Sequence, residues 1–233
     1  MSLRTPFKAL HLYTAPLSGC SARIRTAAHL KSIRLTYHNI DLTSSEQTSQ
    51  SYLSINPNGS VPSLVVESSS DRYTITQSLA ILDFLESHFP DPPLIPAGKG
   101  SWKARARVME LVSLVACDIQ PPQNSRIRKR IEEMFGGDSV KWAKYVYERG
   151  LGVYEEFVER GRRLDEKKDR VGRYSVGNEV SLADVFLVPA VQGALRLGVE
   201  VDRWPLVKGI VDECWKLDAF RKGGLVGHGR LVP

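Results

Sequence analysis

Cysteine is scarce in this chain, which has three among 233 residues: Cys20, Cys117 and Cys214. No two of them form a C-x-x-C pair, and no paired histidines stand beside them. Neither a disulfide framework nor a zinc site is therefore indicated, and we expect no metal. This use of cysteine is typical of a protein from a reducing compartment.

Long apolar runs are also missing. No segment approaches the roughly 18 to 20 apolar residues that span a membrane. The first residues, 1–6, lack the apolar core of a secretion signal. The last three, Leu231-Val232-Pro233, are not a peroxisomal address. From the sequence we expect a cytoplasmic protein without membrane contact.

The charge is modestly positive, with 32 Lys and Arg against 26 Asp and Glu. The densest basic patch, Arg126 to Arg130, is followed directly by Glu132 and Glu133, and no aromatic residue interleaves it. Mixed charge of this kind is typical of a solvated helix face, so we expect no nucleic-acid partner. A small anionic substrate suits such a field better.

The chain predicts two domains joined by a short linker. A Pro- and Gly-rich segment separates Phe89 from Trp102, which places the linker at 91–101, after a first domain over 1–90. Residues 102–233 are expected to be all helical, while the charged stretch 159–173 is expected to be an exposed loop or a frayed helix end. Two apolar stripes at helical spacing carry the expectation for the second domain: Val108, Leu111, Val112 and Val115, and then Val140, Ala143, Tyr147, Leu151, Tyr154 and Val158.

The segment Ser18-Gly19-Cys20-Ser21-Ala22-Arg23-Ile24-Arg25 lies between a strand-like run, 9–13, and a helix-like stripe. The first turn of a helix has unpaired N–H groups and the positive end of the macrodipole, so a thiolate would be stabilised there. Spacing alone favours a plainer interpretation, a serine cap on an ordinary helix.

Two later junctions also present backbone or small polar groups. Val61-Pro62 opens an apolar run, and a proline there leaves the preceding backbone groups free to pair with an extended peptide-like ligand. Gln77-Ser78 begins a helix-like stripe, where an N-terminus would bind a carboxylate. Taken alone, the Val61-Pro62 junction is better explained as a strand opened by a helix-stopping proline.

Together these segments resemble the thioredoxin-like domain of the cytosolic glutathione transferases. Within that family the chain resembles the zeta class, the maleylacetoacetate isomerases, whose Ser-Ser-Cys-Ser-x-Arg-Val-Arg motif matches Ser18 to Arg25. Asp118 to Asn124 and Tyr174 to Pro189 also match segments of that class, and the resemblance runs from Leu10 to Leu217. It implies an α/β thioredoxin-like domain followed by an all-α domain, and a homodimer.

The resemblance also implies a glutathione cofactor and a set of site residues. Ser18 and Cys20 would be catalytic, and Arg196 would bind the substrate carboxylate. The glutathione contacts would be Ser18, Gly19, Cys20, Ser21, Ala22, Arg23, Gln47, Val61, Gln77, Ser78, Gln120, Asn124, Ser125 and Arg126.

From the residues alone, several of these positions have structural interpretations. Pro121 and Pro122 predict a kink or a helix end between Gln120 and Asn124. Taken alone, Arg196 is better explained as a surface arginine beside an apolar helix face. Ser181 to Asp184 predicts a capping box, which serves folding.

Three functions stay open on the sequence. The first is a glutathione-dependent cis–trans isomerase of phenylalanine and tyrosine catabolism, which converts maleylacetoacetate to fumarylacetoacetate by reversible thiolate addition. The second is a zeta-like transferase that acts on α-halo acids or other electrophiles, and the third is a non-catalytic binding module. The chain departs from the class motif at Gly19, where a serine is expected, and at Ala22, where a large aromatic residue is expected.

Overall fold

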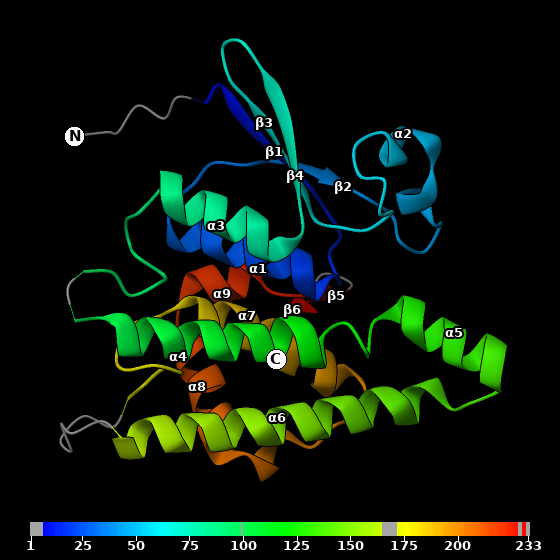
Figure 1. Ribbon diagram of the computed structural model, residues 1–233. Coiled ribbons are helices and arrows are strands. Elements are labelled where there is room, and N and C mark those ends of the chain that lie inside the picture. The colour runs from blue at the N-terminus through cyan, green and yellow to red at the C-terminus, as the bar shows by residue number, and fades with distance from the viewer. Residues whose placement is uncertain (1–6, 99, 165–171, 228–229, 232–233) are drawn as a thin grey trace. The chain divides into compact units, whose positions relative to one another are not determined.

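The structure is a computed structural model that describes residues 7–98, 100–164, 172–227 and 230–231 (Figure 1). The chain divides into two compact units. The first contains the chain as far as Pro92 together with the segment that begins at Arg221, and the second runs from Pro93 to Phe220. None of the described helices combines the length and apolar composition needed to cross a membrane.

The first unit is built on a mixed sheet of four strands in the order β2-β1-β3-β4. The central strand β1 (Ala9–Thr14) runs parallel to β2 (Thr36–Asn39) and antiparallel to β3 (Ser63–Glu67), which pairs with β4 (Arg72–Thr76). This order and the helices described next confirm the thioredoxin-like fold.

Two helices cover one face of this sheet. Helix α1 (Gly19–Leu30) connects the parallel strands β1 and β2, and it packs against α3 (Ser78–His88), as Figure 1 shows. Burial alternates along β1, where Leu10, Leu12 and Thr14 are buried and their neighbours are only half-buried. This alternation has the two-residue period of a strand with one face in the core. Between β2 and β3 lie η1 (Glu46–Thr48) and α2 (Gln50–Leu53).

The second unit consists of helices around a buried central helix, α7 (Leu182–Arg196). The others are α4 (Trp102–Ser113), η2 (Leu114–Ile119), α5 (Ser125–Phe135), α6 (Ser139–Leu164), η3 (Val201–Arg203) and α8 (Pro205–Trp215). Both predicted stripes are buried with one exception. Val140 is 41% exposed, because it lies in the first turn of α6, ahead of the packed part of the stripe. Of the charged stretch 159–173, α6 accounts for the part up to Leu164, and 165–171 lie outside the described residues.

The linker differs from the prediction. Leu94 and Ile95 are buried, and the Leu94 carbonyl accepts a hydrogen bond from the Leu182 N–H at 2.8 Å. That N–H is in the first turn of α7, where it has no partner within the helix. The predicted linker therefore belongs in part to the core of the second unit, from Pro93 onward.

The C-terminal segment also departs from the expected all-helical domain. After α9 (Asp218–Gly223), two short strands pair with each other, β5 (Val226–Gly227) and β6 (Arg230–Leu231), and the segment belongs to the first unit. Gly223 explains the attachment, since a β-carbon there would lie 2.4 Å from the Thr26 nitrogen of α1. Only glycine allows so close an approach of two backbones.

The predicted capping box begins α7. One Asp184 carboxylate oxygen accepts hydrogen bonds from the Ser181 N–H at 2.8 Å and hydroxyl at 3.0 Å, and the other accepts the Ser175 N–H at 2.8 Å. Asp184 is fully buried, and this burial raises the pKa of its carboxyl, while the hydrogen bonds act in the opposite direction. The box ties the loop before α7 to its first turn.

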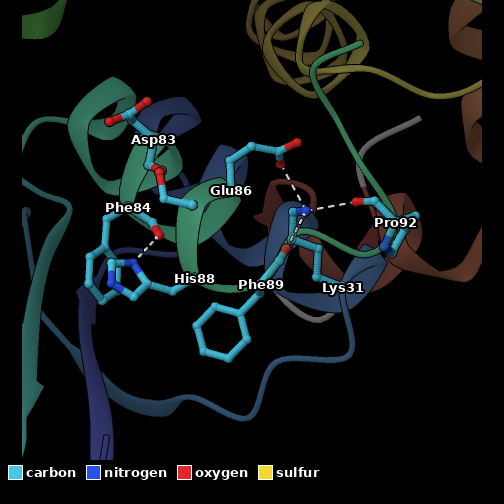
Figure 2. A network of polar contacts seen from close by, with 8 residues as sticks. Lys31, Asp83, Phe84, Glu86, His88, Phe89 and Pro92 are labelled. Carbon is cyan, nitrogen blue, oxygen red and sulfur yellow. Dashed lines mark hydrogen bonds and ion pairs between the residues drawn. The ribbon is translucent and has the colours of Figure 1, made fainter. Parts of the chain in front are cut away.

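Figure 2 shows the polar network at the C-terminal end of α1. The buried ammonium of Lys31, the C-cap of α1, donates to the carbonyls of Phe89 and Pro92, each at 2.7 Å. It also pairs with Glu86 of α3 at 2.8 Å. An ammonium has three N–H donors, so these partners use all of them. Lys31 thereby fixes the end of α3 and the chain that leaves it.

Replacement of Lys31 by methionine should lower the free energy of unfolding by about 3 kcal/mol, because it leaves Glu86 and two carbonyls without their cation. Urea denaturation measures this loss. The exposed Lys208–Asp212 pair on α8 has a similar N–O distance, 3.1 Å, and serves as the control. A K31M midpoint no lower than that of K208M would contradict the prediction.

A second prediction concerns alkaline pH. Burial raises the pKa of the Cys214 thiol far above its ordinary value, so the folded chain keeps a proton that the unfolded chain releases above about pH 8.5. Stability contributed by this proton is complete below the unfolded pKa and is lost as pH rises. Between about pH 9 and 10, C214A should therefore lose about 1.4 kcal/mol less per pH unit than the wild type.

Urea denaturation at a series of pH values checks the slope. C117A is the matched control, because Cys117 is exposed whereas Cys214 is buried. Equal slopes for C214A and C117A would exclude this role for the Cys214 thiol.

Candidate functional site

Ser18 caps the N-terminus of α1. Its hydroxyl oxygen accepts a hydrogen bond from the Ser21 N–H at 3.2 Å, in extended backbone geometry. A serine hydroxyl has one donor hydrogen besides its two lone pairs, so the cap uses acceptor capacity and leaves the O–H able to donate. The half-buried Ser18 thus offers a donor at the positive end of a helix, a place that favours an anion.

The rest of the predicted motif divides by burial. Gly19 and Cys20 are partly exposed in the first turn of α1, whereas Ser21, Ala22 and Arg23 are buried. Ser21 accepts the Ala15 N–H at 3.4 Å, and Ala22 has no exposed surface. These buried side chains support the first turn from inside the unit.

Arg23 reaches from α1 to the start of α3. One of its guanidinium nitrogens donates to the Ser78 hydroxyl oxygen at 3.1 Å, and both residues are buried. This contact brings two of the predicted segments together, because the first turns of α1 and α3 share a polar link. The positive charge of Arg23 therefore lies at the N-terminus of α3 as well.

Gln77 precedes Ser78 with an uncommon backbone. Its φ of 71° and ψ of 123° lie in a region that side chains rarely adopt, and the residue is exposed. Such strain costs of the order of 1 to 3 kcal/mol and is concentrated at ligand sites. The turn that joins β4 to α3 is thus held in a conformation that local preference does not explain.

Val61 lies just before β3 and outside its paired register, which begins at Ser63. The Val61–Pro62 peptide bond is cis. Val61 is half-buried, and no strand pairing engages its backbone. The backbone of Val61 therefore lies outside the described strand pairs, and its use by a peptide-like ligand stays a prediction.

Two residues that the sequence did not single out hold this edge. The Ser60 carbonyl accepts from the Tyr52 hydroxyl at 2.7 Å and from the Asn56 amide at 2.6 Å. Burial raises the pKa of Tyr52, which keeps its donor proton. Both residues lie in a polar, serine-rich stretch without periodicity, where Asn56-Pro57-Asn58-Gly59 is a sequence signal for a turn but not for these contacts.

Gln47 lies in η1 and is half-buried. Its side-chain oxygen is buried, and within the described part of the chain it has no hydrogen-bond partner. A buried acceptor without a donor is rare and costs about 1 to 3 kcal/mol. It is accounted for if a ligand supplies the donor.

The second unit carries the remaining predicted contacts in a turn between two helices. As the prolines predict, η2 ends at Ile119, and α5 begins at Ser125. The Asn124 side chain caps α5 by accepting the Arg126 N–H at 3.0 Å, so its amide N–H₂ group remains the donor. Gln120 is half-buried, and Ser125 and Arg126 are exposed.

Arg196 is the last residue of α7 and is exposed. Its positive charge at a helix C-terminus interacts favourably with the helix dipole, which agrees with the interpretation of Arg196 as a surface residue. It also leaves the guanidinium open to a carboxylate. Among the described residues, no cluster of three or more His, Cys, Asp or Glu side chains could hold a metal ion.

Known proteins share this arrangement. Residues 17–88 match the family model "Glutathione S-transferase, N-terminal domain". A maleylacetoacetate isomerase from Emericella nidulans is 40% identical over 217 residues, which cover 91% of this chain and 90% of that protein.

Solved structures give the same picture. A bacterial maleylpyruvate isomerase of the zeta class, solved in its holo form, is 33% identical with a TM-score of 0.81, over 92% of this chain and 96% of that one. A maleylacetoacetate isomerase from Anaeromyxobacter dehalogenans 2CP-1, solved with glutathione in its active site, is 32% identical with a TM-score of 0.81. That alignment covers 93% of this chain and 94% of the other.

The strain at Gln77 can be tested by itself. Q77G should raise the free energy of unfolding by about 1 kcal/mol relative to Q77A, because only glycine adopts this backbone without cost, and part of the gain is offset by glycine's larger conformational entropy. Urea denaturation of the two variants measures the difference. If Q77G is less stable than Q77A, the turn is not strained.

Proposed function

The chain belongs to the zeta class of the glutathione transferase family, and from this we propose that it is a glutathione-dependent cis–trans isomerase that converts maleylacetoacetate to fumarylacetoacetate. The single observation that carries the proposal is the Ser18 cap. Its geometry leaves a hydroxyl donor at the N-terminus of α1. When bound, glutathione supplies the thiolate that adds reversibly to the cis double bond, after which rotation and elimination give the trans isomer.

Ser18 favours the thiolate by donating its O–H to the sulfur. A thiol of ordinary pKa, about 8.5, is mostly protonated at neutral pH, so the site must lower this value. A hydrogen bond to the charged form and the dipole of α1 both act in that direction. Cys20 lies two residues on, in the same turn and partly exposed, and we place it beside the reacting groups.

The residues of the first unit fit an extended γ-glutamyl peptide. Val61 offers backbone groups outside the sheet ladder, and Gln77 and Ser78 offer the start of α3 to a carboxylate. Arg23 adds positive charge there through Ser78. The buried oxygen of Gln47 would receive a donor from the ligand. Gly19, Ser21 and Ala22 would contribute backbone and packing around the sulfur.

The second unit supplies the other contacts in this proposal. Gln120, Asn124, Ser125 and Arg126 would border glutathione, and Arg196 would bind the substrate carboxylate with its planar fork. For these residues the proposal is supported by the resemblance of the two helix segments and by the exposed ends on which Asn124 and Arg196 lie.

We also propose that the protein works as a cytoplasmic homodimer. The family resemblance supports the dimer, and the three free cysteines suit a reducing compartment. Light scattering during size-exclusion chromatography reports the oligomeric state directly.

The test uses maleylacetone, an analogue of the substrate, with catalytic amounts of glutathione, and follows both loss of the cis isomer and total free thiol. We expect isomerisation without loss of thiol. S18A should reduce the rate at least about a hundredfold, because the loss of one preorganised hydrogen-bond donor to an anion costs about 2.7 kcal/mol or more.

S49A is the matched control. Ser49 caps α2 with the same geometry, accepting the Tyr52 N–H at 3.2 Å, so both variants lose one cap. A similar loss of activity in S18A and S49A would reduce the role of Ser18 to folding. Consumption of thiol with a haloacid and no isomerisation would favour the transferase, and glutathione binding without either activity would favour a binding module.

Maleylpyruvate is the second candidate substrate, since the zeta-class holo structure similar to this chain is a maleylpyruvate isomerase. The reaction is the same, because both substrates have a cis double bond conjugated to carbonyl groups. The ratio of kcat/KM for the two substrates decides between them.

A further inference from the structure

Arg25 is a buried side chain whose guanidinium N–H donors all have hydrogen-bond partners. It is 7% exposed, and a guanidinium has five N–H donors. Nη1 donates to the Thr14 hydroxyl at 2.8 Å and to the Ala15 carbonyl at 3.0 Å. The remaining donors reach the carbonyls of Pro16 at 3.2 Å, Gly223 at 3.0 Å and Gly224 at 2.8 Å. Arg25 thus joins the loop before α1 to the C-terminal segment.

These five acceptors are all neutral. Burial lowers the pKa of Arg25 from 12.5 to about 10, so the guanidinium is still charged at neutral pH. Within the described residues, four carbonyls and one hydroxyl hold this buried charge, whereas Lys31, the C-cap of the same helix, pairs with the Glu86 carboxylate. An anion near the start of α1 would be attracted by that charge.

Ala15 connects Arg25 to Ser18, the N-cap of α1. Its carbonyl accepts both from Arg25 and from the Ser18 N–H at 3.2 Å, and its own N–H donates to Ser21 at 3.4 Å. Arg25, Ala15 and Ser18 are therefore linked through a single carbonyl oxygen. A shift of the loop would move the serine hydroxyl directly.

The C-terminal segment holds Arg25 from the other side through the Gly223 and Gly224 carbonyls, and we call this pair of contacts the clamp. Its two carbonyl acceptors can reach Arg25 because Gly223 lies against the backbone of Thr26, where a β-carbon would be within 2.4 Å of the nitrogen. The C-terminal segment lies about 200 residues from α1 along the chain, at separations of 198 and 199 for these two bonds. The clamp therefore depends on where the end of the chain docks.

We propose that Arg25, clamped by the Gly223 and Gly224 carbonyls, is a positioning residue that holds the Ser18 hydroxyl at the glutathione sulfur and stabilises the thiolate with its positive charge. The inference rests on the proposed function, because it assumes that the sulfur lies at Ser18. It assigns the C-terminal segment a part in the reaction that neither helix capping nor the dipole requires.

The experiment titrates the thiol of bound glutathione by the ultraviolet absorbance of its thiolate, at saturating protein, and records thermal unfolding of the same samples. R25M removes both charge and hydrogen bonds, and R25K keeps the charge with fewer donors. We expect R25M to raise the pKa of the bound thiol by about one unit, a tenfold loss of thiolate, and R25K to recover part of it. At neutral pH, kcat should fall with the thiolate fraction while KM for maleylacetone changes little.

Two further variants separate positioning from stability. K31M removes the other buried cation with carbonyl partners on α1, at the end of the helix away from Ser18, so it should unfold at a lower temperature without changing the pKa of the bound thiol. G223A displaces the clamp while leaving Arg25 intact, and it should raise that pKa. R25K and G223A carry the test if R25M does not fold.

Unchanged thiol pKa values in R25M, R25K and G223A, with losses of stability like that of K31M, would overturn the inference and leave Arg25 a structural role. Failure of the proposed function itself would be seen in the wild-type protein and not in the variants. In that case the wild-type protein would bind no glutathione or would leave the thiol pKa at its value in free glutathione.

Discussion

Three buried cations on α1 hold the first unit together. Arg23, Arg25 and Lys31 are each less than a tenth exposed, and each reaches a different part of the chain. Arg23 contacts the start of α3, Arg25 the loop before α1 and the C-terminal segment, and Lys31 the end of α3. These contacts position the starts of α1 and α3, whereas Tyr52 and Asn56 hold the Ser60 carbonyl beside Val61. Hydrogen bonds are directional, so they fix geometry more closely than apolar packing alone would.

Buried charge has a cost, and the acceptors show how it is offset. A charged group taken out of water destabilises the fold unless hydrogen bonds replace its hydration. Lys31 has a carboxylate and two carbonyls, whereas the partners of Arg25 among the described residues are neutral oxygens. The difference follows the two ends of the helix. A carboxylate pairs with Lys31 at the C-terminal end of α1, whereas the described partners of Arg25 are neutral, so the charge of Arg25 adds to the positive potential of the dipole where a thiolate would lie.

Much of the fold could be predicted from the sequence, because apolar periodicity reports directly on which face is buried. The strand predicted at 9–13 and the buried stripes of α4 and α6 follow from it, and the caps at Ser18 and Ser181 follow from the capping preference of serine. The buried cations could not be predicted in this way, since arginine and lysine are ordinarily read as exposed and their partners are mostly backbone carbonyls. The docking of the C-terminal segment could not be predicted either, for a similar reason. It depends on one glycine and on contacts nearly 200 residues apart, which leave no local pattern.

The two departures from the zeta-class motif have different physical weight. Ala22 is fully buried in α1, so the exchange of a large aromatic residue for alanine at this position changes packing inside the unit. Gly19 is partly exposed in the first turn, directly after the cap. In the proposed site, a serine there would add a hydroxyl beside the sulfur, whereas glycine lacks that donor and adds conformational freedom to the turn. Under the same proposal Ser18 would bear the hydrogen bonding of the thiolate largely by itself, and its placement would depend more on the Ala15 carbonyl and on the arginine that holds it.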